Sequence, residues 1–128
     1  MTSVRGDKSG RSDIEARSSK RKRGEWGYLI MWEFQVRSKM EKRFEKIYGS
    51  GGDWVRLFIQ DESYFGTDLI RSLDGKRTYI TLDFWRSRQA YDEFRERHLA
   101  KYEVLDQQCE DLTESEREIG RFVRVPSK

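Results

Sequence analysis

The chain has 128 residues, a net charge of +3 and 38% charged residues, and this length fits a single domain with its own core. No stretch approaches the roughly 18 apolar residues of a membrane-spanning helix. The single Cys109 leaves no internal disulfide, and with one histidine there is no Cys/His set for zinc. We therefore expect a soluble, cytoplasmic protein without a protein-held metal or a membrane partner.

The positive charge is concentrated at the N-terminus. Residues 1–24 contain eight Lys and Arg, among them the run Lys20-Arg21-Lys22-Arg23, against three Asp and Glu, and no aromatic residue. This composition predicts a solvated, disordered basic tail over residues 1–24 and one folded domain over residues 25–128. Nuclear targeting is one alternative for the tail and a nonspecific contact with a polyanion is another. Because the folded part lacks this excess, we expect at most weak nucleic-acid contact, through the tail.

The first strand and the first helix follow from two periodicities. Apolar residues alternate from Gly27 to Val36, which predicts a strand. The capping box Ser38-Lys39-Met40-Glu41 then predicts a helix that begins at Ser38 and ends at Gly49. Its apolar residues at helical spacing are Met40, Phe44, Ile47 and Tyr48.

The segment of residues 48–54, YGSGGDW, resembles a phosphate-binding loop only in its glycine content. A P-loop that began at Gly49 would need Gly-Lys-Ser/Thr where this chain has Trp54-Val55-Arg56. The segment also follows a predicted helix, whereas phosphate-binding loops follow a strand. We interpret it as a joint between two helical pieces, with Asp53 as the N-cap of the second.

A hairpin and a long helix follow the joint. The patterns predict strands over Tyr64–Leu73 and Arg77–Trp85, joined by a turn at Asp74-Gly75, because both residue types tolerate positive φ. Ser87 is expected to start one continuous helix that runs to about Leu112. Its apolar stripe consists of Tyr91, Phe94, His98, Tyr102, Leu105, Cys109 and Leu112.

The C-terminal segment completes the order of elements. Thr113-Glu114-Ser115-Glu116 is a second capping box and predicts a short helical turn, and Ile119–Val125 predicts the last strand. The order is that of an α+β, ferredoxin-like βαββαβ fold with a four-stranded antiparallel sheet. Two helices cover only one face of such a sheet. The other face, with Leu29 and Met31, would be an exposed apolar patch, so we expect a homodimer with sheet against sheet.

His98 is the obvious general acid or base, because its ordinary pKa lies near neutrality. It also lies on the apolar stripe, where a lone histidine can equally be a satisfied core residue. The large aromatic residues have the same two interpretations, core packing or a pocket for a flat substrate. They are Trp32, Trp54, Trp85, Tyr91, Phe94 and Tyr102. Asp83, on a central strand, could pair with an arginine across the dimer.

Several stretches resemble one family. The segment Trp85-Arg86-Ser87-Arg88-Gln89-Ala90-Tyr91 is similar to the Trp-x-Ser-x-x-Ala-aromatic signature of the antibiotic biosynthesis monooxygenase family, whose members are dimeric α/β-barrel proteins. The likeness extends over residues 27–125, through the runs YFGTDLIRSLDGKRTYITLDFWRSRQAYDEF and KYEVLDQQCEDLTESEREIGRF. This resemblance implies a homodimeric barrel of two back-to-back sheets, with one pocket per subunit between the helices and the sheet.

Some members of this family oxygenate polycyclic aromatic substrates with neither metal nor flavin. The resemblance thus implies a monooxygenase-like protein that needs no cofactor and acts on a hydrophobic, aromatic small molecule. By position, His98 and Tyr102 are the candidate catalytic residues, and the candidate substrate pocket consists of Trp32, Trp85, Tyr91 and Phe94. The alternative is a non-enzymatic ligand-binding or dimerisation module of the same fold, so enzymatic activity stays an open question at this point.

Overall fold

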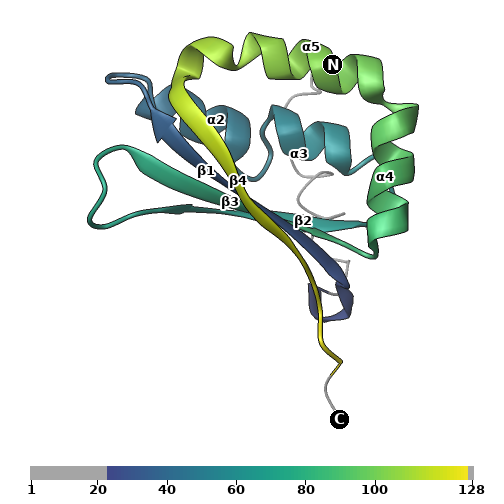
Figure 1. Ribbon diagram of the computed structural model, residues 1–128. Helices are drawn as coiled ribbons and strands as arrows, with labels where there is room; N and C mark the ends of the chain where they lie inside the picture. The colour runs from purple at the N-terminus through teal and green to yellow at the C-terminus, as the bar shows by residue number, and fades with distance from the viewer. Residues whose placement is uncertain (1–22, 127–128) are drawn as a thin grey trace, which may run out of the picture.

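The computed structural model describes residues 23–126, which form a four-stranded antiparallel sheet with its α-helices on one side (Figure 1). The elements, in chain order, are a short 3-10 helix η1 (Arg23–Glu25), β1 (Tyr28–Val36), α2 (Glu41–Tyr48), α3 (Asp53–Phe58), β2 (Tyr64–Arg71), β3 (Thr78–Trp85), α4 (Arg88–Arg97), α5 (Leu99–Gln108), a second 3-10 helix η2 (Glu110–Leu112) and β4 (Thr113–Val123). This order confirms the predicted α+β, ferredoxin-like fold. Residues 1–22, most of the predicted basic tail, lie outside the described residues.

Strand β1 lies inside the sheet, whose strand order is β2-β3-β1-β4. Tyr28, Ile30, Phe34 and Val36 are buried, whereas the residues between them are partly exposed. This alternation confirms the strand predicted from the sequence, and it places one set of β1 side chains under the helices.

Helix α2 begins three residues later than the capping box predicts, so the expectation that Ser38 starts it is wrong. Lys39 has a φ of 71°, in the left-handed region, and residues 38 and 39 therefore form a turn. The helix starts at Glu41, and its N-cap Met40 makes no side-chain capping bond. Phe44 and Tyr48 are buried, as their spacing predicts.

The glycine-rich segment is the predicted joint between α2 and α3. Gly51 has a φ of 81°, a conformation that glycine adopts without a steric penalty. A Cβ atom at Gly52 would lie 2.3 Å from the carbonyl oxygen of Ile47, so the chain passes too close to α2 for any side chain there. Gly52 is consequently the N-cap of α3, and the expectation that Asp53 caps this helix is wrong. Asp53 is its first helical residue, where a carboxylate still favours the helix N-terminus.

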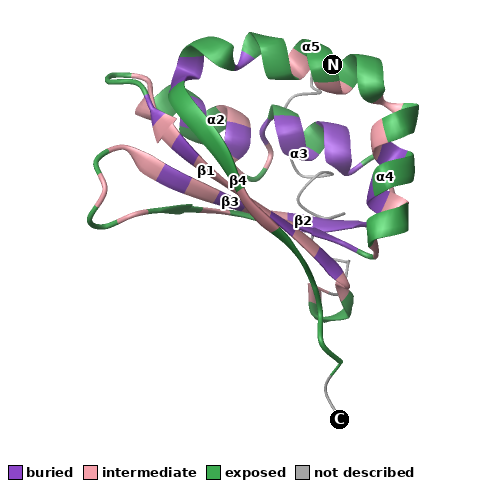
Figure 2. Cartoon of the chain, viewed as in Figure 1, coloured by how far each residue is buried: buried purple, intermediate pink, exposed green. Residues whose placement is uncertain are grey.

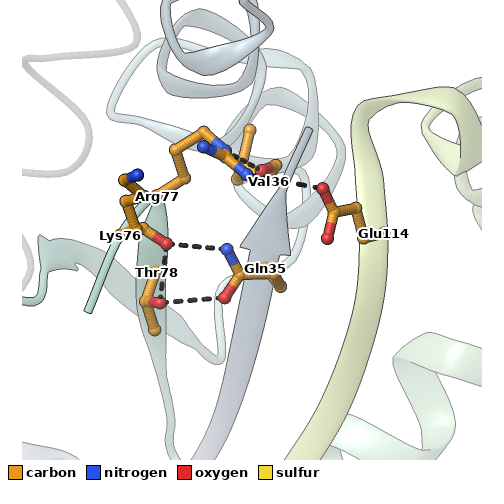
Figure 3. A network of polar contacts seen from close by, with 6 residues as sticks. All are labelled: Gln35, Val36, Lys76, Arg77, Thr78 and Glu114. Carbon is orange, nitrogen blue, oxygen red and sulfur yellow. Dashed lines mark hydrogen bonds and ion pairs between the residues drawn. The ribbon is translucent and has the colours of Figure 1, made fainter. Parts of the chain in front are cut away.

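The β2–β3 hairpin is present, but its loop differs from the predicted tight turn. Residues 72–77 form the loop, and the positive φ of 50° belongs to Arg77 rather than to Asp74 or Gly75. The reason lies in the contacts of Arg77 with the neighbouring strands. Its Nε donates to the carbonyl of Val36 at 2.9 Å, and its guanidinium pairs with Glu114 of β4 at 3.5 Å (Figure 3).

A second link joins the same loop to β1. The amide nitrogen of Gln35 donates to the carbonyl of Lys76 at 2.6 Å, and the hydroxyl of Thr78 donates to the amide oxygen of Gln35 at 3.0 Å (Figure 3). The hairpin end is thereby fixed against β1 and β4.

The predicted helix from Ser87 to Leu112 is broken at His98, so the expectation of one continuous helix is wrong. The N-cap is correct: the hydroxyl of Ser87 accepts from the amide of Ala90 at 3.1 Å. Helix α4 ends at Arg97, and α5 runs off in a different direction across the other helices (Figure 1). A straight helix over residues 88–112 would be about 38 Å long, whereas the eight residues of β3 span only about 26 Å. The break keeps both halves over the sheet.

Strand β4 begins at Thr113, so the predicted helical turn at this capping box is wrong. Thr113 pairs with Val36 at the end of β1, and that pairing continues the sheet in place of a turn. Further along, Gly120 lies opposite Met31 and Glu118 lies opposite Trp32, so Ile119 is an extra residue in a β-bulge. As a result Glu118 and Arg121, three positions apart, both lie on the helix-covered face.

The two faces of the sheet have different surroundings. The buried core lies between the sheet and the helices, and α3 is buried along most of its length (Figure 2). The opposite face, which we call the open face, is formed by alternate residues of the strands. Its apolar members are Leu29, Met31, Ile70, Ile80, Leu82, Phe84 and Phe122.

Candidate functional site

A cavity of about 330 Å³, partly open to the surface, lies between the helix-covered face of the sheet and the helices. Aromatic rings form much of its wall, including those of Trp32, Tyr48, Trp54, Tyr91 and Tyr102. Its polar lining comes from both layers of the domain: Thr67, Thr81 and Asp83 from β2 and β3, Arg95 and Asp106 from α4 and α5, and Glu116, Glu118 and Arg121 from β4. The cavity is thus an aromatic pocket with a small set of ionisable groups, the usual character of a small-molecule site.

The structure brings together three of the residues predicted from the sequence. Trp32, Tyr91 and Tyr102 line the cavity. Trp85 and Phe94 do not, because both are fully buried, with 0% exposure, and contact each other in the core at a ring separation of 5.0 Å. Their predicted place in the substrate pocket stays a prediction, and their observed contacts are those of core residues.

His98 lies outside the lining of this cavity. It is the junction residue between α4 and α5, partly buried, and its ring packs on that of Phe94 at 4.8 Å. This is the environment of the core interpretation that the apolar stripe left open. The catalytic role predicted for His98 stays a prediction.

Asp83 is the cavity residue whose role the sequence did not reveal. It lies on β3, opposite Ile30 of β1 and Thr67 of β2, on the helix-covered face. A pairing across a sheet-to-sheet dimer is therefore wrong for Asp83, because it faces away from the open face. The sequence did contain one indication of this. Asp83 lies two residues from Thr81 and two from Trp85, so it shares the buried side of a central strand with them.

A short chain of hydrogen bonds holds the Asp83 carboxylate. The hydroxyl of Thr67 donates to Asp83 Oδ1 at 2.7 Å, and the same hydroxyl lies 2.5 Å from the phenol oxygen of Tyr64. Burial raises the pKa of Asp83 to about 6, while the hydrogen bond from Thr67 acts in the opposite direction. Asp83 is consequently a carboxylate that exchanges its proton near neutral pH, as a general base must.

Tyr102 and Arg95 form one part of the cavity wall. The guanidinium of Arg95 lies 3.9 Å from the centre of the Tyr102 ring, and that ring meets Trp54 edge-on at 5.0 Å. Burial raises the pKa of Tyr102 well above its ordinary value. The Tyr102 phenol therefore stays protonated and can donate a hydrogen bond to an oxygen in the cavity.

Arg121 reaches the cavity from β4 and is already paired. Its Nε and Nη2 lie 3.1 and 3.2 Å from the two carboxylate oxygens of Glu118, and its Nη1 donates to the phenol of Tyr28 at 3.3 Å. These bonds raise the pKa of Arg121 and keep it charged. The β-bulge at Ile119 makes this pair possible, because residues three apart on a regular strand point to opposite faces.

The remaining acids of the cavity are Asp106 and Glu116. Burial raises the pKa of Glu116, and the negative charges of Asp106 and Glu110 add to the effect. Within residues 23–126 no group of His, Cys, Asp and Glu is arranged to hold a metal ion. The same part of the chain has no helix long and apolar enough to cross a membrane.

No protein-family model and no curated protein matches the sequence, but solved structures match the fold. SnoaB from Streptomyces nogalater, a cofactor-independent oxygenase, aligns with a TM-score of 0.55 and 18% identity over 78% of this chain and 94% of its own. A proposed antibiotic biosynthesis monooxygenase from Bacillus cereus aligns with a TM-score of 0.53 and 16% identity, over 80% of this chain and 97% of its own. The chain has the fold of the antibiotic biosynthesis monooxygenases.

A dimeric ferredoxin-like protein from an uncultured marine organism aligns equally well, with a TM-score of 0.56 and 14% identity over 84% of this chain and 95% of its own. The resemblance to antibiotic biosynthesis monooxygenases predicted from the sequence is thereby confirmed for the fold. At such low identity the likeness carries no information about substrate or activity.

Proposed function

We propose that this protein is a cofactor-independent oxygenase that acts on a hydrophobic, aromatic small molecule bound in the cavity beside Asp83. One observation carries the proposal: a carboxylate with a pKa of about 6 lies inside an aromatic cavity of about 330 Å³. Ligand pockets have volumes of about 300–1,000 Å³, so the cavity suits a compact aromatic ligand. SnoaB, which shares the fold, is a cofactor-independent oxygenase and supports the same activity here.

In the proposed reaction the substrate is an aromatic ketone with an acidic CH2 group. Asp83 removes one proton from that carbon, and the resulting enolate passes one electron to O2. The two radicals then combine through a new C–O bond to form a peroxide. Its O–O bond breaks as the second hydrogen leaves the carbon as a proton, so that the carbon becomes a carbonyl. One O2 is consumed, and one water is released for each ketone oxidised.

Tyr102 supplies the hydrogen bond that the enolate needs. Its phenol lines the cavity and stays protonated, because burial raises its pKa. A donor aimed at the oxygen where negative charge develops stabilises the transition state most strongly in a site that excludes water. Tyr102 thus keeps the catalytic role that its position in the sequence predicted, as a donor and not as a base.

His98 is the second candidate for the base. Asp83 is better placed, because it lines the cavity whereas His98 does not. The variant His98→Gln separates the two, since it removes the imidazole and leaves the residues of the cavity wall in place.

The test is oxygen consumption with anthrone, a fused-ring ketone with an acidic CH2 group, as the probe. We expect the wild-type rate to rise with pH through about 6, as Asp83 ionises. The rate should fall at least ~100-fold in Asp83→Asn, the magnitude typical of a lost general base. Asp68→Asn is the matched control, because Asp68 is an exposed carboxylate on the neighbouring strand. An unchanged rate in Asp83→Asn would contradict the proposal.

A ligand-binding module without turnover is the alternative function. It is favoured by the position of Trp85 and Phe94, which fill space that the sequence assigned to the substrate pocket. Binding of anthrone without any oxygen consumption above the buffer rate would decide for this alternative.

We also propose that the protein is a homodimer formed through the open face. Ile70 and Phe122 on that face are 49% and 42% exposed, and Leu29, Met31, Ile80 and Leu82 are partly exposed beside them. A contiguous apolar patch of this kind usually marks an interface. The dimeric ferredoxin-like protein of similar fold favours a second copy of this chain as the partner.

Two expectations from the sequence stay proposals: a cytoplasmic location and weak nucleic-acid contact through the basic tail. A tail contact would weaken steeply with salt and would disappear when residues 1–24 are removed.

A further inference from the structure

The two cations of the cavity differ in their partners. Arg121 is engaged by both carboxylate oxygens of Glu118 and by Tyr28. Arg95 takes part in none of the ion pairs found in residues 23–126. Its Nε is buried and has no hydrogen-bond partner in this part of the chain. The Arg95 side chain also interacts with the phenol of Tyr91, but its Nε stays without a partner. Because buried donors in folded proteins are almost always hydrogen-bonded, this Nε indicates an acceptor that comes from outside the chain.

The guanidinium of Arg95 lies over the ring of Tyr102. The group lies against the face of the Tyr102 ring at 3.9 Å, an arrangement stabilised by attraction between a cation and an aromatic ring. A guanidinium is planar and presents its N–H groups as a fork that matches the two oxygens of a carboxylate. Arg95 is therefore positioned as a receptor for a planar anion beside an aromatic wall.

Solvent reaches this part of the molecule through a second hollow. A wide surface groove of about 700 Å³ runs along α4, and it shares Tyr91, Arg95 and Arg121 with the cavity. The groove and the cavity therefore adjoin at these three residues. A charged group in the groove lies beside Arg95.

We propose that the ligand of this cavity is an aromatic acid whose carboxylate binds Arg95 while its rings lie among Trp32, Trp54 and Tyr102. The inference rests on the proposed function, because the same ligand would present its reactive carbon to Asp83. The acids Asp106 and Glu116, whose negative charges act on each other, also line the cavity, and a carboxylate placed beside them would be repelled. This repulsion favours the orientation with the acid group at Arg95.

Three probes of one shape and different charge test this assignment: 2-naphthoate, neutral 2-naphthamide and cationic 2-naphthylmethylammonium. Their dissociation constants are measured by calorimetry at pH 7.5. The wild type should bind the naphthoate at least ~10-fold more tightly than the amide, the size of one charge-assisted hydrogen-bonding contact. Arg95→Gln should remove this preference and leave the affinity for the amide within about twofold, because the ring contacts remain. Arg95→Lys keeps the charge but not the two-oxygen contact and should keep only part of the preference.

Arg88→Gln is the matched control. Arg88 lies on the same helix, with a side chain 74% exposed, and it lines the groove but not the cavity. The Arg88→Gln variant should keep the full preference for naphthoate. Loss of the preference in this variant would show that the carboxylate binds in the groove. Equal binding of acid and amide, or tightest binding of the amine, would overturn the inference and leave the proposed oxygenase activity standing. Selectivity for the acid together with no oxygen consumption would instead overturn the proposed activity alone.

Discussion

Successive residues of β1 point into two different environments. Tyr28, Ile30 and Phe34 lie beneath the α-helices, whereas Leu29 and Met31 lie on the open face, which no α-helix of the described chain covers (Figure 2). One end of this face, at Phe84, is covered by Arg23 of η1 and by Trp26. The covered face nevertheless contains the ionisable groups Asp83, Glu118 and Arg121, and the open face has mostly apolar residues on its central strands. An isolated domain normally keeps its charged residues in water and leaves no large apolar patch uncovered, so both features depart from the usual distribution.

This contrast indicates what each face is for. Charged groups under a layer of helices lower stability unless they are paired, so their presence there suits a site that binds or transforms a ligand. Apolar residues left in water favour association, so the open face suits a second copy of the chain. The helices thus cover the face with the candidate site, and the second copy would cover the face that holds the dimer together.

A pair of Phe→Ala variants should give the largest effect and the sharpest contrast. Phe94 on the covered side is 0% exposed, and Phe122 on the open face is 42% exposed. Phe94→Ala should lower the free energy of unfolding by about 3–5 kcal/mol, because it leaves a cavity in a packed core. Phe122→Ala should cost less than about 1 kcal/mol at protein concentrations low enough for a monomer. Urea denaturation followed by circular dichroism measures both, and equal losses would remove the distinction between the two faces.

Leu82→Glu tests the open face as an interface. Burying an unpaired carboxylate between two sheets should weaken the proposed dimer by roughly 100-fold, about 3 kcal/mol. Light scattering over a dilution series measures the change in association. The control is Val104→Glu on α5, which adds the same charge at an apolar residue that is 54% exposed but lies on the helical layer. A wild-type protein that is already monomeric at micromolar concentration would contradict the proposed homodimer.

Asp83→Asn should give a smaller effect that depends on pH. Burial raises the pKa of Asp83 from 3.8 to about 6 in the folded protein, so ionising this residue disfavours folding. The loss of stability is absent below pH 4, grows between pH 4 and about 6, and is complete above that range. The asparagine variant should therefore be more stable than the wild type by roughly 1–3 kcal/mol at pH 8. Below pH 4 it should show no gain, and thermal unfolding at the two pH values checks both expectations.

The sequence was sufficient for the elements whose signals are local. The alternation along β1, the hairpin and the Ser87 cap all depend on residues close together in the chain, and all are present in the structure. The break at His98 could not be predicted in this way. It depends on how long the sheet beneath the helix is, whereas the apolar stripe itself continues through His98 without interruption.

The residues of the candidate site also separate into those with a local signal in the sequence and those without one. Trp32, Tyr91 and Tyr102 could be predicted because large aromatic residues on the inner side of an element are natural pocket residues. Asp83 and Arg95 could not be assigned, because their importance depends on which side chains lie near them from other elements. Thr67 lies beside Asp83, and Tyr102 lies beside Arg95. Trp85 and Phe94 are buried core residues outside the cavity lining. The sequence could not separate them from the lining residues, because an aromatic residue of the core and one of a pocket give the same pattern.

The bulge at Ile119 determines on which face of the sheet the charged residues of β4 lie. Glu118 and Arg121 reach the same side only because one residue between them is left unpaired. If Ile119 were instead paired in a regular strand, Glu118 and Arg121 would point to opposite faces, and one charge of this pair would lie on the open face. That charge would lie at the surface where the second copy is proposed to bind, and its former partner would be left alone in the cavity. The bulge thus couples ligand chemistry to subunit association, although no side chain belongs to both sites.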